Sequence, residues 1–312
     1  MTVIVISGGL SHERDVSLRS GRRVTQALRE VGHDVLEADV GADLVDTVRS
    51  TPDPVVIPML HGGLGEDGAL REVLGLLAVP FVGATGAASR LTFDKAVATQ
   101  VVSNADLTTT RQVALPHDIF RELGAPAVMQ AIDERLGYPL MVKPSRSGSA
   151  LGALKVDDRD SLASALVGAF AYGPVAIIEQ FVFGTEVAVT VLEDENGPRA
   201  LPPVEIRPSS GVYDYEARYT AGATRFVTPA DLPAEQLRAT QQLAVDAHRA
   251  LGLRHLSRSD MVVTPDGVPV FLEGNVAPGM TETSLAPLAF EAAGLDLGSV
   301  YSSLINLARS SS

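Results

Sequence analysis

The first third of the chain alternates short apolar runs with stretches of helical spacing, and this pattern limits the fold more than any other feature. The apolar runs lie at residues 3–7, 35–40 and 55–59. Between the first two runs, Val24, Leu28 and Val31 recur at the spacing of one helix face. Strands that alternate with helices form βαβ units around a parallel sheet. The sequence therefore predicts an α/β fold that begins with a parallel sheet.

The length of the chain predicts more than one domain. At 312 residues it exceeds the roughly 100–200 residues of a typical domain. A small-residue segment at 83–86 follows the N-terminal pattern, and a strand at 175–179 closes the middle one. We therefore expect domains at residues 1–88, 89–180 and 181–312.

Net charge and cysteine content argue against several classes of function. The chain has 25 Lys and Arg against 38 Asp and Glu, a formal net charge of −13, so its surface repels nucleic acids and anionic membranes. It has no Cys, which excludes disulfides and thiolate chemistry. No apolar stretch reaches the roughly 18 residues of a membrane span, and the start lacks a basic secretion signal. We expect a cytoplasmic protein without nucleic-acid or membrane partners.

The most informative polar pattern lies in a predicted β-hairpin. Residues 256–263 and 268–275 have strand composition, and the segment Thr264-Pro-Asp-Gly267 between them is typical of a tight turn. We assume the register that pairs Val263 with Val268 across this turn.

This register predicts a polar cluster on one face of the hairpin. It places Arg258 opposite Glu273, and Asp260 opposite Phe271. Because side chains alternate between faces, one face then carries Arg258, Asp260, Glu273 and Asn275. Carboxylate and amide oxygens suit Mg²⁺, which indicates a site for a magnesium–nucleotide complex. The alternative is a solvated strand face with an Arg–Glu pair.

Two further segments have the composition of binding loops. Small residues at 143–152 let backbone N–H groups approach phosphate oxygens, and Lys143 adds a positive charge, although the Walker A pattern is absent. Without other support, such a segment is more often a simple turn. Residues 206–225 form a long polar and aromatic loop, of a length that usually serves a function.

Two N-terminal loops follow predicted strands, where α/β folds bind ligands. In residues 8–14, Glu13 and Arg14 indicate a site for charged amino-acid groups, or else the acidic first turn of a helix. His61 begins the glycine-dense loop at 61–68, and a lone histidine there is usually structural.

Six stretches occur in a fixed order along nearly the whole chain: GGLSHERDVSLRSG, HGGLGEDG, FDKAVA, LGYPLMVKPSRSGSALG, VYDYEARY and LEGNVAPGMTETSL. In this order they resemble the D-alanine–D-alanine ligases of the ATP-grasp superfamily. The resemblance implies a three-domain ATP-grasp architecture. Its parts would be an N-terminal Rossmann-like substrate domain, a central subdomain, and a C-terminal subdomain that carries the metal site and a lid loop at 206–225.

The resemblance also implies an activity. Such ligases use ATP to join two D-alanines into D-alanyl-D-alanine for peptidoglycan precursors. The γ-phosphoryl group moves to the first carboxylate, and the second amine displaces phosphate from that acyl phosphate. The implied cofactors are two Mg²⁺ or Mn²⁺ ions with ATP as co-substrate, and the implied assembly is a homodimer.

The family's site residues carry over to matching positions of this sequence. The expected metal ligands are Asp260, Glu273 and Asn275. The expected nucleotide contacts are Lys95, Lys143, Ser149, Glu179, Glu186 and Arg218. The expected substrate contacts are Glu13, His61, Arg258, Gly279 and Ser284. The expected catalytic groups are Glu13, Ser149, Tyr219, Arg258, Gly279 and Ser284.

Several positions depart from the family's pattern. Arg218 stands where Lys is usual, Ser147 where an acid is usual, Ala150 where a second Ser is usual, and Gly274 where a branched residue is usual. These departures leave open a related ATP-grasp carboxylate–amine ligase that acts on, or cyclises, a different D-amino acid. A catalytically silent nucleotide-binding regulator is a further alternative, which the intact lysines and metal ligands disfavour.

Overall fold

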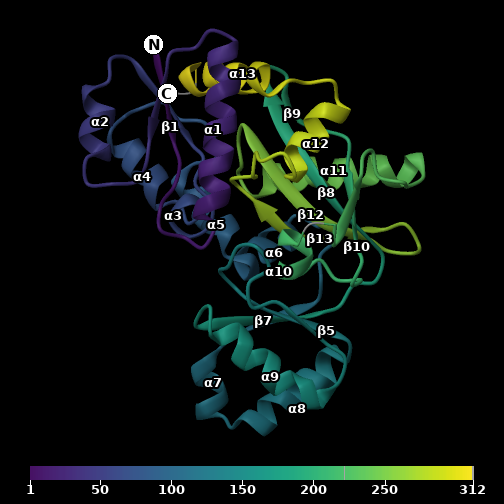
Figure 1. Ribbon diagram of the computed structural model, residues 1–312. Helices are drawn as coiled ribbons and strands as arrows, with labels where there is room; N and C mark the ends of the chain where they lie inside the picture. Colours follow the sequence, from purple (N-terminus) through teal and green to yellow (C-terminus); the bar gives the residue numbers. More distant parts are fainter. Residues whose placement is uncertain (221, 311–312) are drawn as a thin grey trace.

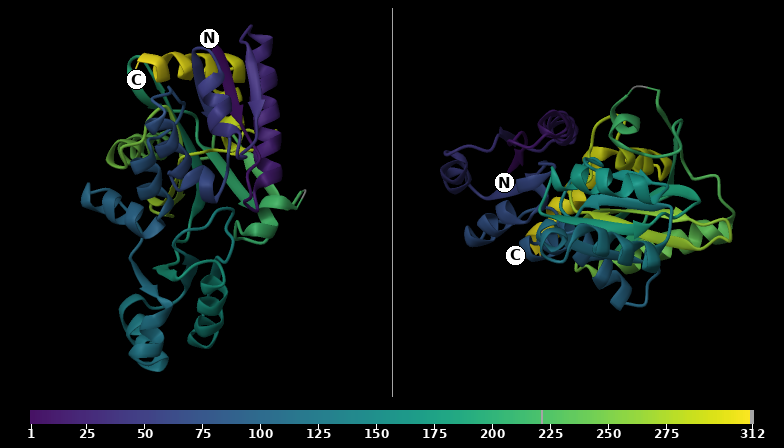
Figure 2. Two further views of the ribbon diagram at one scale, coloured as in Figure 1. Left: turned by 90° about the vertical axis from the view of Figure 1, so that its left-hand side faces the viewer. Right: turned by 90° about the horizontal axis from the view of Figure 1, so that it is seen from below.

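The structure is a computed structural model that describes residues 1–220 and 222–310, with the side chain of Tyr219 left out of the description. It contains three β-sheets. A lower part, which carries β5 (Leu140–Pro144), β7 (Val175–Gln180) and the helices α7 (His117–Glu122), α8 (Ala125–Leu136) and α9 (Arg159–Phe170), stands away from the rest of the molecule in Figure 1 and in the left view of Figure 2. The upper part contains the N-terminal sheet and the sheet formed by strands from the later part of the chain.

The N-terminal sheet is parallel, as the sequence predicts. Its strands β1 (Thr2–Ile6), β2 (Val35–Ala38) and β3 (Pro54–Pro58) are ordered β2-β1-β3. The helices of this region are α1 (Arg14–Glu30), α2 (Leu44–Ser50), α3 (Gly63–Glu66), α4 (Ala69–Leu76), α5 (Gly86–Phe93) and α6 (Lys95–Asn104). In the central strand β1, the residues Val3 to Ile6 are fully buried. The continuous apolar run of this strand therefore matches a sheet that is covered on both faces.

The middle sheet is antiparallel. Its order is β4-β7-β5-β6, formed by β4 (Gln112–Pro116), β7 (Val175–Gln180), β5 (Leu140–Pro144) and β6 (Leu154–Val156). The helices here are α7 (His117–Glu122), α8 (Ala125–Leu136) and α9 (Arg159–Phe170). Helix α9 begins where the Asp158 side chain accepts a hydrogen bond from the Ser161 N–H at 3.0 Å.

The third sheet is the largest and has helices on both faces. Its order is β11-β10-β8-β12-β13, with β9 paired to β8. The strands are β8 (Thr185–Asp194), β9 (Gly197–Ala200), β10 (Val204–Pro208), β11 (Thr224–Val227), β12 (Leu256–Val263) and β13 (Pro269–Asn275). The helices are α10 (Tyr215–Tyr219), α11 (Ala234–Ala250), α12 (Leu285–Ala292) and α13 (Leu297–Ser310).

The alternation of side chains on β8 separates two hydrophobic cores. Ala188 and Leu192 face a core that α12, α13 and the N-terminal sheet share. Val187 and Val189 face the other core, which includes residues of α11. Helix α13 also packs on α1, so the C-terminal end of the chain covers the N-terminal sheet (Figure 1).

The predicted hairpin exists, but its predicted register is wrong. Val263 pairs with Pro269, Asp260 with Glu273, and Arg258 with Asn275. The register shifts between Asp260 and Met261, which leaves one extra residue on β13. The physical reason is Phe271, which is fully buried opposite Met261 in the α11 core and so faces away from the polar cluster. Beyond the bulge, Glu273 pairs with Asp260 and Asn275 pairs with Arg258, so these four side chains still lie on one face of the hairpin.

The segment predicted as a long loop at 206–225 is more ordered than expected. It contains α10, where the Asp214 side chain accepts a hydrogen bond from the Ala217 N–H at 2.9 Å, and it continues into β11. Strands β9 and β10 are separate because Pro202 and Pro203 between them cannot donate ladder hydrogen bonds.

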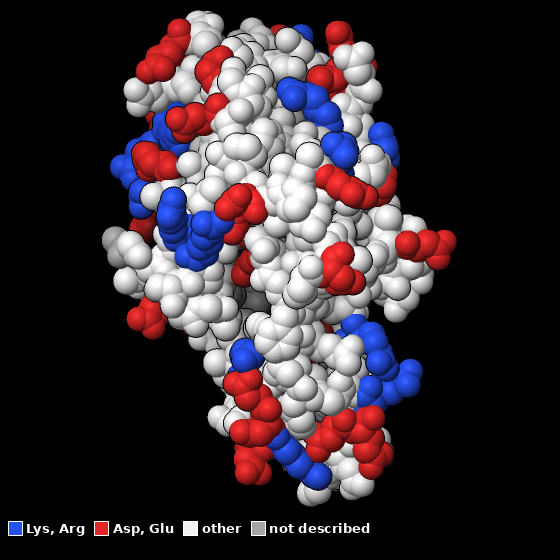
Figure 3. All heavy atoms as spheres, turned by 90° about the vertical axis from the view of Figure 1, so that its right-hand side faces the viewer, with Lys and Arg blue, Asp and Glu red and all other residues white. Residues whose placement is uncertain are grey.

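Two expectations concern the surface. Among the described residues, no helix is long and apolar enough to cross a membrane. On the face drawn in Figure 3, acidic and basic side chains are interspersed, without a continuous basic stripe. The divisions at 88/89 and 180/181 remain predictions.

Candidate active site

Two adjoining cavities occupy the junction of the three sheets. The first has a volume of about 190 Å³ and is lined by the N-terminal loops and the end of β13. The second has a volume of about 390 Å³ and is lined by the facing sides of the middle and third sheets. Five residues are shared between the linings of the two cavities: Lys95, Ser147, Tyr213, Arg218 and Glu273. A molecule in one cavity would therefore meet a molecule in the other at these side chains.

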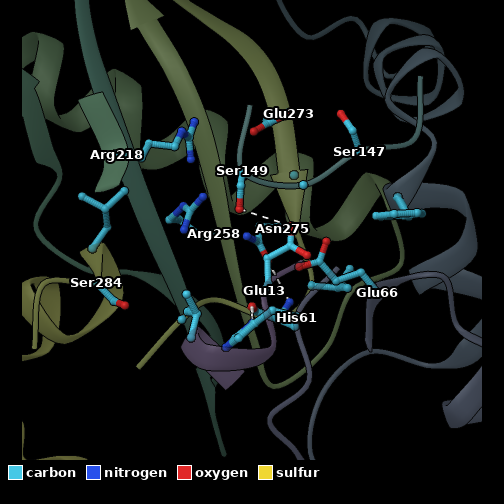
Figure 4. Close-up of a pocket in the computed structure, with 18 of the residues that line it drawn as sticks. Glu13, His61, Glu66, Ser147, Ser149, Arg218, Arg258, Glu273, Asn275 and Ser284 are labelled. Carbon is cyan, nitrogen blue, oxygen red and sulfur yellow. Dashed lines mark hydrogen bonds between the residues drawn. The ribbon is translucent and has the colours of Figure 1, made fainter. Parts of the chain in front are cut away.

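The cavities collect the predicted site residues. The first is lined by Glu13, His61, Lys95, Ser149, Arg218, Arg258, Glu273, Asn275, Gly279 and Ser284. The second is lined by Lys95, Lys143, Glu179, Glu186, Arg218, Asp260 and Glu273. Tyr219 is the remaining predicted residue, and its side chain lies outside the described part of the chain. Figure 4 shows that the labelled side chains of the first cavity come from several distant segments.

Glu13 is held tightly at the start of α1. Its side chain is buried, and its Oε1 accepts a hydrogen bond from the Ser149 hydroxyl at 3.2 Å. A Cβ atom on Gly62 or on Gly148 would collide with the Glu13 carboxylate in its present position, so a larger residue in either loop would displace that carboxylate. Three sequence segments thus converge on one carboxylate in the first cavity.

His61 is a neutral, buried hydrogen-bonding residue. Its Nδ1 lies 2.9 Å from the Ala277 carbonyl, which can only accept, so the ring proton is on Nδ1. Its Nε2 then accepts from the Ser20 hydroxyl at 3.2 Å. Burial lowers the pKa of His61 to about 4. The ring therefore stays neutral near pH 7.

The hairpin face carries closely paired charges. Arg258 donates two hydrogen bonds to Asp260, at 2.6 and 2.8 Å, and both side chains are buried. Lys95 Nζ lies 3.3 Å from Glu273 Oε2. Burial raises the pKa of Glu273, but the nearby cations, Lys95 first, outweigh burial and lower it well below its usual value. Glu273 is therefore ionised at neutral pH.

The second cavity contains a buried lysine and an aromatic wall. Lys143 Nζ lies 2.6 Å from Glu179 Oε1, and Glu179 also accepts from the Thr110 hydroxyl at 2.9 Å. Burial lowers the pKa of Lys143, but nearby carboxylates, Glu179 first, outweigh it and raise the pKa above its usual value. Phe181 and Phe183 form an edge-to-face pair in the wall, with ring centres 5.0 Å apart.

Arg218 of α10 reaches the junction of the two cavities. Its guanidinium lies over the Tyr213 ring at 4.3 Å from the ring centre. A lysine at this position would present a compact ammonium with weaker stacking. The stacking on Tyr213 is therefore a structural reason for arginine, in place of the family's usual lysine, at position 218.

The hairpin ligand set fits a divalent cation. Asp260, Glu273 and Asn275 offer carboxylate and amide oxygens on one face, and each oxygen has a second lone pair beyond its present contact. The described residues contain no group of three His, Cys, Asp or Glu side chains arranged to hold a metal. Two carboxylates and one amide, completed by water and phosphate oxygens, suit Mg²⁺ rather than zinc.

Sequence reasoning missed two residues of the site. Glu66 of α3 lines the first cavity beside Glu13, and burial raises its pKa (Figure 4). Tyr213 lines both cavities. Both lie inside motifs quoted above, and an acid or an aromatic residue within such a motif was the available signal.

Two antiparallel sheets that enclose a lysine-containing pocket are the arrangement of the ATP-grasp fold. This chain has that fold. The family model described as "D-ala D-ala ligase C-terminus" matches residues 101–306. The chain therefore belongs to the D-alanine–D-alanine ligase family.

Individual relatives agree with this assignment. The D-alanine–D-alanine ligase of Pelotomaculum thermopropionicum is 38% identical over 308 residues, which cover 99% of this chain and 96% of the relative. That of Halalkalibacterium halodurans is 37% identical, over 98% and 99% of the two chains. The VanG D-Ala:D-Ser ligase of Enterococcus faecalis matches with a TM-score of 0.86 at 30% identity, covering 98% and 99%. The D-alanine–D-alanine ligase of Bacillus anthracis, complexed with ATP, matches with a TM-score of 0.83 at 25% identity over the full length of both chains.

Proposed function

We propose that this chain catalyses the ATP-dependent ligation of two D-alanines to D-alanyl-D-alanine, for peptidoglycan precursor synthesis. The observation that carries the proposal is the meeting of the two cavities at five shared residues. Segments 1–88, 89–180 and 181–312 all contribute to the lining of the two cavities, and the five shared residues come from the last two segments. A nucleotide in the second cavity would point its phosphates at an amino acid in the first.

The first cavity would bind the amino acids. Glu13 would bind the ammonium group of the first D-alanine, and His61 would line that subsite. Ser284 would bind the carboxylate of the second D-alanine. The polar lining and the small volume support substrates of this size.

The second cavity would bind ATP. Lys95 and Lys143 would contact its phosphates, with Arg218 near the γ-phosphate. Glu179 and Glu186 would contact the adenine end and the ribose. The aromatic wall formed by Phe181 and Phe183 supports a planar base between the two sheets.

The reaction would proceed in two steps. In the first, a carboxylate oxygen of D-alanine bonds to the γ-phosphorus, the bond to the β-phosphate oxygen breaks, and ADP leaves. In the second, the amine of the other D-alanine attacks the acyl carbon, phosphate leaves, and the amine loses a proton. Arg258 and the Gly279 N–H would stabilise the negative oxygen of the tetrahedral intermediate.

Asp260, Glu273 and Asn275 would hold two Mg²⁺ or Mn²⁺ ions, which neutralise phosphate charge when bound. Arg258 would then share Asp260 with a metal instead of pairing with it alone. The paired charges on the hairpin face support this, because a buried carboxylate needs a counter-charge in every state.

The segment at 206–225 would act as a lid. An acyl phosphate reacts with water, so solvent must be excluded while it exists. Ser149, from the loop after β5, and Tyr219, from α10, would link the two loops over the site. The contact between Ser149 and Glu13 supports a link from the lid to the substrate ammonium.

A substrate panel tests the proposed function. ADP release is measured with D-Ala, D-Ser, D-lactate and L-Ala, and products are identified by mass spectrometry. We expect turnover when D-Ala is the only amino acid added, and a product with the mass of D-alanyl-D-alanine. D-Ser belongs in the panel because the VanG relative is a D-Ala:D-Ser ligase. Turnover only with another D-amino acid would instead support the related carboxylate–amine ligase.

We also propose a cytoplasmic homodimer, because the six motifs resemble a family with that assembly and the reaction requires ATP. Light scattering after size-exclusion chromatography tests the assembly. A mass near twice 32.7 kDa is expected, and a single-chain mass at micromolar concentration would contradict it.

A further inference from the structure

The loop at residues 277–284 carries Gly279 and Ser284, the groups that the proposed function assigns to the oxyanion and to the second D-alanine. This loop is held by helix α1, which precedes it by more than 250 positions in the sequence. Ser20 and Arg23 lie three residues apart on α1 and therefore share a helix face. Both side chains contact the backbone of the loop.

The contacts satisfy three backbone groups of the loop. The Ser20 hydroxyl accepts a hydrogen bond from the Met280 N–H at 3.0 Å. Arg23 Nη1 donates to the Met280 carbonyl at 3.1 Å and to the Thr281 carbonyl at 2.8 Å. His61 adds a fourth contact, since it donates to the Ala277 carbonyl and accepts from Ser20.

Thr281, which Arg23 contacts, is in turn hydrogen-bonded to Ser284. The Thr281 carbonyl accepts from both Arg23 and the Ser284 N–H, the latter at 3.1 Å. In return, the Thr281 N–H donates to Ser284 Oγ at 3.1 Å. Movement of Thr281 would therefore move the hydroxyl of Ser284. Thr281 is buried, so its carbonyl would have little access to water if Arg23 were lost.

We infer that Arg23, supported by Ser20, is a positioning residue for the second amino acid. This inference rests on the proposed function, because it uses the subsite assigned there to Ser284. Arg23 lies outside the metal and nucleotide sites. Its effect should therefore fall on binding of the second D-alanine and leave ATP binding unchanged.

The neighbouring residue Arg22 provides a matched control. It is exposed on α1, and the hydrogen bond that the structure gives it goes to the Leu18 carbonyl of its own helix, at 3.2 Å. Arg22→Ala removes the same charge and the same side-chain length as Arg23→Ala without touching the loop.

The test compares Arg23→Ala, Arg23→Lys and Arg22→Ala in steady-state kinetics with ATP and D-alanine. For Arg23→Ala we expect the KM of the second D-alanine to rise about tenfold, with the KM of ATP within about twofold of wild type. Arg23→Lys, which keeps one donor, should recover part of this loss. Arg22→Ala should match the wild type. If Arg23→Ala does not fold, Arg23→Gln takes its place.

The outcomes separate the inference from the proposed function. An unchanged KM for the second D-alanine, or an equal rise in every KM, would overturn the positioning role. A lower kcat with unchanged KM values would also overturn it, because a partly unfolded preparation gives that result. A wild-type enzyme that does not ligate D-alanine would instead refute the proposed function.

Discussion

Glu186 on β8 offers a sharp test of the electrostatics of the nucleotide cavity. Burial raises the pKa of its carboxyl from 4.5 to about 7. Arg218 and Arg258 act in the opposite direction, and Asp260 and Glu273 add to the effect of burial. At pH 8 the folded chain therefore holds an ionised carboxylate in surroundings that favour its neutral form.

The sign of the stability change follows from proton linkage. The folded state binds this proton more tightly than the unfolded state, so Glu186 lowers stability as the pH rises from about 4.5 through 7. The full shift corresponds to about 3 kcal/mol at most above pH 7. Glu186→Gln removes this cost with little change of shape. For a chain of 312 residues, the gain at pH 8 corresponds to about 5 °C in the unfolding midpoint.

The assay is thermal unfolding of the nucleotide-free protein at pH 5 and pH 8, monitored by circular dichroism. We expect Glu186→Gln to raise the midpoint at pH 8 and to raise it only about a quarter as much at pH 5, where the folded-state carboxyl is still protonated. Glu195→Gln, on the exposed turn between β8 and β9, is the control for the same chemical change. An equal shift at both pH values, or a loss of stability at pH 8, would refute the assignment.

Three further predictions test other parts of the structure. Glu273→Gln should lower kcat at least about a hundredfold in ADP-release assays while the far-UV circular dichroism spectrum stays unchanged, since it removes charge from the metal set. Phe271→Ala should lower the free energy of unfolding by about 3–5 kcal/mol in urea titrations, because the ring is fully buried. Gly148→Ala should raise the KM of the first D-alanine about tenfold, because the added Cβ would displace the Glu13 carboxylate; an unchanged KM would contradict that subsite.

The strands were predictable from sequence because their signal is local. The buried runs that became β1, β3 and β7 consist of apolar residues bounded by polar or turn residues, and each was placed within about two positions. The register of β12 with β13 was not predictable in the same way. It depends on the burial of Phe271 against α11, a contact between distant segments that forces a bulge.

Much of the lining of the two cavities was predictable as a set of residues but not as a set of contacts. Ordered motifs identified Glu13, Lys143 and Glu273 without any knowledge of the fold. Neither the pairing of Lys143 with Glu179 nor the glycine contacts around Glu13 can be derived from spacing. The first depends on β5 and β7 being neighbours in the middle sheet, and the second joins three separate loops. The glycine at position 274 could not be explained from sequence either. The reason for it is tertiary packing, because a Cβ atom there would lie 3.0 Å from Thr92 Cγ2, which disfavours the family's usual branched residue.

The charge of the nucleotide cavity explains how so acidic a chain could bind a polyanion. Its lining includes four cationic side chains, Lys95, Lys143, Arg207 and Arg218, and five acidic ones, Glu179, Glu186, Glu205, Asp260 and Glu273. This lining has no excess of positive charge, and its two lysines already contact carboxylates. Triphosphate alone would therefore meet little net attraction. A nucleotide that arrives with divalent cations would change this balance, because the proposed ligands Asp260 and Glu273 would then bind the cations instead of repelling phosphate. Asp260 and Glu273, which oppose a bare triphosphate, would thus favour a metal–nucleotide complex under the proposed assignment.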